Sequence, residues 1–122
     1  MRQLYAVVGW GMIALGVAHM IVALRTFHTL NGAAIWFFNG GITLVLEGAL
    51  NLLNRSYGLI APGLRRVCIG TNIVMTVFGV VSGIAMQATI TGFILVLGLT
   101  GGATALALSR GALCQRVEFK AS

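Results

Sequence analysis

One acidic residue lies in the middle of an apolar stretch, where a carboxyl group is rare and costly. Glu47 falls within residues 35–53, and the only other acidic residue of the chain is Glu118, near its C-terminus. No lysine or arginine lies at the depth of Glu47, so its carboxyl group costs least in the neutral form. Such a group can serve a carrier as its proton-binding centre or an enzyme as its general acid. It can also simply hold helices together by hydrogen bonds.

Small and polar residues accompany Glu47 at helical spacing. A helix over residues 34–54 would align Glu47 with Trp36, Gly40, Thr43, Asn51 and Asn54. A helix over residues 67–86 carries a similar stripe, formed by Cys68, Asn72, Thr76, Gly79 and Gly83. Asn72 and Thr76 fall at the depth of Glu47, and we expect them to hydrogen-bond its carboxyl group. The predicted ligand or proton site comprises Glu47, Asn51, Asn72, Thr76 and Thr43, together with His19 and Asn39.

A second candidate pair is His19 with Asn39, which fall at matching depths of the first and second apolar stretches. We predict that the imidazole hydrogen-bonds Asn39 or lines a polar entrance; the alternative is an ordinary histidine between helices. His28 is too far along the chain to share a metal ion with His19, and Cys68 and Cys114 match no metal-binding spacing. We therefore predict no metal site and no cofactor.

The elements that must position these residues are apolar helices. Of the 122 residues, 58% are hydrophobic and 8% are charged, whereas soluble domains have about 25% charged residues. Each of the apolar segments approaches the ~20 residues that cross a ~30 Å hydrocarbon core. Polar residues 87–91 force the last two segments into a hairpin. The expected fold is all-α, one integral membrane four-helix bundle over residues 1–122, with helices at 4–24, 34–54, 67–86 and 89–108 and a cytoplasmic tail at 109–122.

The basic residues predict the orientation of this bundle. With four spans, one side of the membrane receives only Arg25, and the other receives Arg2, Arg55, Arg65, Arg66, Arg110, Arg116 and Lys120. The positive-inside rule then places both termini in the cytoplasm of a multi-pass protein of the inner membrane. Because these charges flank apolar runs rather than forming one patch, the net charge of +6 does not indicate a nucleic-acid partner.

Three functions fit these features. The first is an oligomeric carrier or channel-like protein with Glu47 as its ionisable centre, acting on a lipophilic or small cationic ligand. The second is an accessory subunit that docks on a larger membrane complex through glycine faces such as Gly79/Gly83 and Gly98/Gly102. The third is an enzyme or binder for a lipophilic molecule, with Glu47 as acid or base. Motifs of soluble enzymes are missing from the sequence, and the third function needs a cavity between the helices. We rank the three functions in this order.

Overall fold

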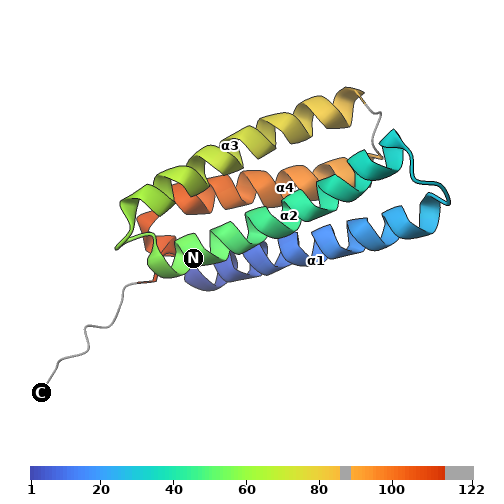
Figure 1. The fold of residues 1–122 in the computed structure, drawn as a ribbon. Helices are drawn as coiled ribbons and strands as arrows, with labels where there is room; N and C mark the ends of the chain where they lie inside the picture. The colour runs from blue at the N-terminus through green and yellow to red at the C-terminus, as the bar shows by residue number, and fades with distance from the viewer. Residues whose placement is uncertain (86–88, 115–122) are drawn as a thin grey trace, which may run out of the picture.

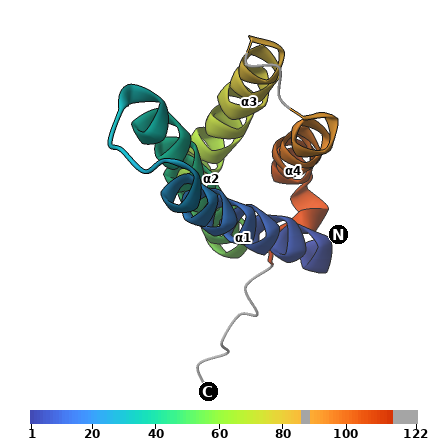
Figure 2. The same cartoon turned by 90° about the vertical axis from the view of Figure 1, so that its right-hand side faces the viewer.

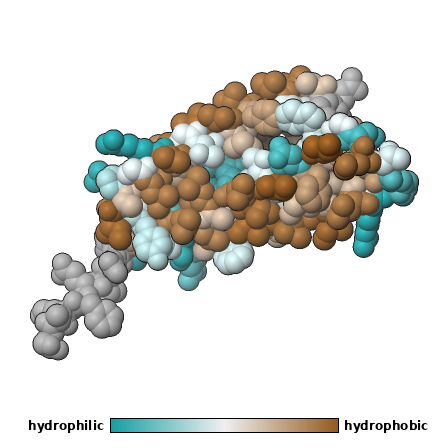
Figure 3. Space-filling model, in the orientation of Figure 1, coloured by the Kyte–Doolittle hydropathy of each residue, from teal (hydrophilic) through white to brown (hydrophobic). Residues whose placement is uncertain are grey.

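A computed structural model of the chain describes residues 1–85 and 89–114, and every regular element in these ranges is helical. Four helices are long and apolar enough to cross a membrane, as predicted. They run up and down beside one another (Figure 1), and apolar side chains cover most of the visible middle of the molecule (Figure 3). The elements are α1 (Arg2–Thr26), α2 (Gly32–Tyr57), α3 (Pro62–Ala85), α4 (Ile90–Leu108) and a short 3₁₀ helix, η1 (Arg110–Ala112).

The helices are longer at several ends than hydropathy alone predicts. α3 begins at Pro62, because proline fits the first turn of a helix, where its missing N–H is not needed. Pro62-Gly63 is therefore the start of a helix. Asn31 caps α2 by accepting a hydrogen bond from the backbone N–H of Ala34 at 2.9 Å. The predicted end of the third helix at Met86 lies outside the described residues.

Glycines bring α1 and α2 into backbone contact. A Cβ atom on Gly16 would lie 2.6 Å from the carbonyl oxygen of Gly41, and one on Gly48 would lie 2.6 Å from that of Gly9. Side chains at these positions would push the helices apart, so both pairs need glycine. The predicted pair Gly98/Gly102 differs, because both positions on α4 face open space. Within this chain, the close glycine contact belongs to the first helix pair.

The two helix pairs meet tightly at only one end of the bundle. We call this end, which carries the N-terminus, the α2–α3 connection and η1, the terminal end, and the opposite end the distal end (Figure 1). In α3 no described residue beyond Asn72 is buried, and in α4 none before Thr100 is buried. In the end-on view, α2 and α3 converge away from the viewer and stand apart at their distal ends (Figure 2). The core shared by all four helices therefore occupies the terminal half.

Residues after α4 close the terminal end. Ala112 and Leu113 are fully buried against a cluster that includes Tyr5, Cys68 and Leu106. The backbone N–H of Cys114 donates to the carbonyl oxygen of Arg55 at 2.7 Å, which fixes this segment to the end of α2. Residues 109–114, the start of the predicted tail, therefore pack against the bundle. The small and apolar residues at 111–113 make this packing favourable. Three residues are too few to cross a membrane, which takes about 20.

Candidate functional site

Glu47 lies at the boundary between the closed terminal half and the parted distal half. Its side chain is only 2% exposed, and neither carboxyl oxygen has a hydrogen-bond partner in the described part of the chain. The predicted inward face of α2 accounts for this position: Asn51 and Asn54 are fully buried, Thr43 is half-buried, and Trp36 is exposed. Exposure along this face rises towards the distal end, and Glu47 is the last buried polar residue before the helices part.

Asn51 is the centre of a buried hydrogen-bond network next to Glu47. Its side-chain oxygen accepts hydrogen bonds from the Tyr5 hydroxyl and the Asn72 amide, both at 2.8 Å. Its own amide group donates to the Asn72 side-chain oxygen at 2.8 Å and to the backbone carbonyl of Glu47 at 2.9 Å. Asn54 donates to the Tyr5 hydroxyl at 2.9 Å. These bonds join α1, α2 and α3, and they seal the core on the terminal side of the carboxyl group.

The predicted hydrogen bonds to the Glu47 carboxyl group are not formed. Asn72 lies at about the expected depth, but it pairs with Asn51 in a reciprocal amide contact. Thr76 donates its hydroxyl hydrogen to the backbone carbonyl of Asn72 at 2.7 Å. Each side-chain amide has a donor and an acceptor, so two facing amides can form two hydrogen bonds with each other. A carboxyl group offers one proton at most. The amide pair therefore forms, and Glu47 lacks a donor.

Two threonine hydroxyl groups, on α3 and α4, lie at the level of Glu47 along the bundle. The side-chain oxygens of Thr76 on α3 and Thr104 on α4 are 3.3 Å apart. Thr76 follows Asn72 by one turn towards the distal end, and Glu47 is offset from Asn51 by one turn in the same direction. The Asn51–Asn72 bond therefore sets Glu47 and Thr76 at one level on facing helices. Thr104 was not predicted, because its depth and helix face depend on how α4 packs.

His19 and Asn39 are not brought together by a hydrogen bond in the described ranges. The His19 ring instead stacks on Phe37, with ring centroids 3.9 Å apart. Asn39 is exposed, and its backbone carbonyl accepts the hydroxyl group of Thr43 at 2.9 Å. Their depths match, as predicted, but close glycine packing turns α1 and α2 so that His19 meets the Phe37 side of α2. The predicted site thus separates into a central group around Glu47 and a distal pair without a shared contact.

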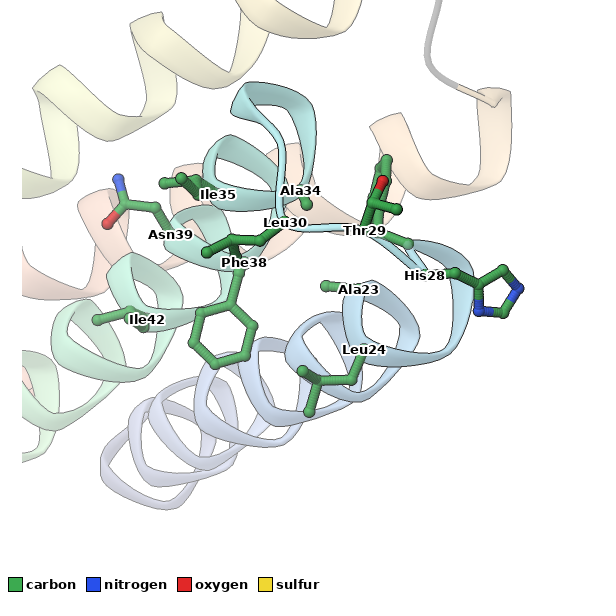
Figure 4. A pocket seen from close by; sticks show the side chains of 11 residues that line it. Ala23, Leu24, His28, Thr29, Leu30, Ala34, Ile35, Phe38, Asn39 and Ile42 are labelled. Atoms are coloured by element: carbon green, nitrogen blue, oxygen red, sulfur yellow. The ribbon is translucent and has the colours of Figure 1, made fainter.

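A separate pocket lies at the distal end, between the end of α1 and the start of α2. Its volume is about 420 Å³, and its walls are mostly apolar, with Leu24, Phe38 and Ile42 among them. His28 is part of the lining, but its ring points away from the other lining side chains (Figure 4). The lining contains none of the central group, so this pocket is separate from the Glu47 carboxyl group.

Comparison with known proteins leaves the site to be interpreted from its geometry. No protein-family model matches the chain, and no similar curated protein or solved structure was found. Among residues 1–85 and 89–114, no group of three histidine, cysteine or acidic side chains is placed to hold a metal ion. The candidate site therefore centres on one buried carboxyl group beside a network of side-chain amide groups.

Proposed function

We propose that this protein is a small, oligomeric carrier of the inner membrane whose transport cycle depends on protonation of Glu47. The observation that supports the proposal best is the carboxyl group itself, which is 2% exposed and has no hydrogen-bond partner among the described residues. A buried carboxyl group without a partner changes its environment greatly when it gains or loses a proton. It can therefore couple a proton to a change between two arrangements of the helices.

The division of the bundle into two halves supports the same proposal. The terminal half is closed by the Asn51 network and by Leu113, while the inward faces of α3 and α4 lose their burial towards the distal end. A carrier needs a central site that opens to one side of the membrane while the other side is closed. With both termini in the cytoplasm, as the basic residues favour, the closed side would be cytoplasmic and the parted side external.

Four short helices offer little room for a pathway, so the carrier would work as an oligomer. Apolar side chains along α3 remain open to their surroundings: Val74 is 64% exposed, Val77 is 58% exposed and Val81 is 59% exposed. A second subunit or lipid can cover this face. The same exposed face, with open Gly98 and Gly102 on α4, favours an accessory subunit of a larger membrane complex as the second candidate function.

A carbodiimide such as dicyclohexylcarbodiimide provides a direct test of the carboxyl group. This apolar reagent adds to a protonated carboxyl group and leaves an acylurea whose mass is read by peptide mass spectrometry. We expect Glu47 to be labelled in the membrane, with labelling that weakens as the pH rises. Glu118→Gln is the matched control, because it removes the only other acidic side chain and should leave labelling unchanged. Lack of labelling at any pH would argue against protonation of Glu47.

Transport is tested with the protein reconstituted in vesicles that contain a trapped pH indicator. A proton gradient is imposed, and a panel of alkali metal ions and lipophilic organic cations is added in turn. We expect at least one cation to dissipate the gradient in vesicles with the parent protein and none to do so with Glu47→Gln. Full activity in a well-folded Glu47→Gln variant would exclude proton coupling through this residue, and the accessory-subunit proposal would then take first place.

A further inference from the structure

The core layer around Glu47 contains oxygen atoms that accept hydrogen bonds and too few hydrogens to satisfy them. Neither Glu47 oxygen has a partner among the described residues. Thr76 donates its hydroxyl hydrogen to Asn72 at 2.7 Å, and Thr104 donates its own to the backbone carbonyl of Thr100 at 2.9 Å. A hydroxyl group has a single hydrogen. The two threonine oxygens lie 3.3 Å apart, where either hydroxyl group can donate to the other, so each oxygen keeps at least one lone pair for a further ligand.

We infer that this layer binds a compact monovalent metal cation, with the charge and size of Na⁺, in exchange for the proton on Glu47. The inference rests on the proposed carrier function and names its coupling ion. Oxygen ligands from a carboxylate and from hydroxyl groups are those that hard cations prefer. The carboxylate comes from α2, and the hydroxyl groups come from Thr76 on α3 and Thr104 on α4. Ion binding would thus draw together helices of both pairs.

Charge and size favour a monovalent ion. One cation of charge +1 neutralises the single carboxylate, whereas a divalent ion would leave a net charge in the apolar core, where it is costly. Two oxygens at right angles around an ion, each at ~2.4 Å as for Ca²⁺, lie about 3.4 Å apart. The Thr76–Thr104 separation of 3.3 Å fits this spacing. Na⁺ has nearly the radius of Ca²⁺ and half its charge.

The surrounding groups do not supply another cation. Tyr5 and Cys68 belong to the network on the terminal side of this layer, and on its distal side the His19 ring stacks on Phe37. α4 has no titratable residue between Ile90 and Leu108. Arg65 lies at the terminal end, where it donates to the backbone carbonyl of Leu108 at 2.7 Å.

Protection from carbodiimide tests the inference on the full chain in vesicles. Glu47 labelling is compared at one pH in sodium chloride, potassium chloride and choline chloride of equal concentration. We expect Na⁺ to slow labelling, about elevenfold when its concentration is ten times its Kd, and choline to have no effect. Glu47 labelling at the same rate in all three salts would overturn the cation site and leave the proton site intact. Lack of labelling in every salt would instead overturn the proposed function.

Threonine variants locate the ion. Thr104→Val and Thr76→Val remove one hydroxyl group each and keep the shape of the side chain, so Glu47 should still be labelled but lose its protection by Na⁺. Thr71→Val is the matched control, because Thr71 is half-buried on α3 outside the inward stripe and should keep full protection. Thr104→Ser should restore protection. Full Na⁺ protection in both Thr76→Val and Thr104→Val would contradict the assignment of this layer.

Discussion

The contact between α1 and α2 makes a quantitative prediction about Gly16. In Gly16→Ala, the new Cβ atom would lie 2.6 Å from the backbone oxygen of Gly41 and 2.9 Å from the backbone N of Val45. Backbone atoms cannot move aside by changing rotamer, so the helices must separate. Overpacking of this kind costs about 1–3 kcal/mol. Alanine also stabilises a helix by up to about 1 kcal/mol relative to glycine, which partly offsets the cost.

Gly98→Ala isolates the packing contribution, because Gly98 also lies within a helix and a Cβ atom there meets nothing within 4 Å. The gain in helix propensity is common to both variants and cancels in their difference. We expect Gly16→Ala to be less stable than Gly98→Ala by about 1–3 kcal/mol. Unfolding in mixed micelles with increasing dodecyl sulfate would measure this, with the fluorescence of Trp10 and Trp36 as the signal. Equal stability of the two variants would refute backbone contact between the helices.

Three further predictions concern the core and the distal end. Asn51→Leu should destabilise the bundle by about 1–2 kcal/mol because it leaves Asn72 unpaired; adding Asn72→Leu should cost less than the sum of both single changes, as a double-mutant cycle would show. Leu113→Ala should lower stability by about 2–5 kcal/mol, since Leu113 is fully buried; thermal unfolding in detergent would measure the loss, and an unchanged midpoint would contradict the packed end. His19→Leu should change stability by about 0.5 kcal/mol or less, because the imidazole stacks on Phe37 without a side-chain hydrogen bond in the described ranges; a larger loss in the same assay would indicate a bridge between helices.

The sequence predicted the helices better than it predicted their contacts. Apolar character summed over about 20 residues identifies a span reliably, and the stripe of α2 correctly indicated that Glu47, Asn51 and Asn54 face inward. The terminal segment was missed because three residues around Leu113 give no periodic signal. The glycines that join α1 to α2 were also missed, since a glycine-rich apolar chain offers many similar spacings and only the packed helices distinguish them.

Asn51 and Glu47 compete for Asn72 as a hydrogen-bond partner, and the pattern of a single helix does not show which of them is chosen. Depth along the membrane could be counted from the sequence, and it placed Asn72 near Glu47. The choice of Asn51 as the partner of Asn72 depends on the rotation of both helices about their axes. Thr104 enters the layer only because α4 packs against α3, which the sequence implied through the hairpin but did not orient.

The distribution of donors and acceptors separates a functional role for Glu47 from a structural one. Besides the carboxyl oxygens, the only buried side-chain polar atom without a partner in the described residues is the Asn54 oxygen, which lies directly against Gly58. A glutamine at position 47 would have the same shape and would bring two amide hydrogens to the level of the Thr76 and Thr104 oxygens. We therefore expect Glu47→Gln to be as stable as the parent or more stable by about 0.5–1.5 kcal/mol, the usual net value of a hydrogen bond.

The same substitution should abolish proton-coupled transport, because an amide neither releases a proton nor neutralises a cation. A gain in stability with a loss of activity is the pattern of a site kept for function at a cost to the fold. Unfolding in detergent, measured in parallel with proton flux in vesicles, would show both effects on one preparation. If Glu47→Gln were instead markedly less stable, the carboxyl group would have to make hydrogen bonds that this arrangement does not contain, and its role would be to hold the helices together.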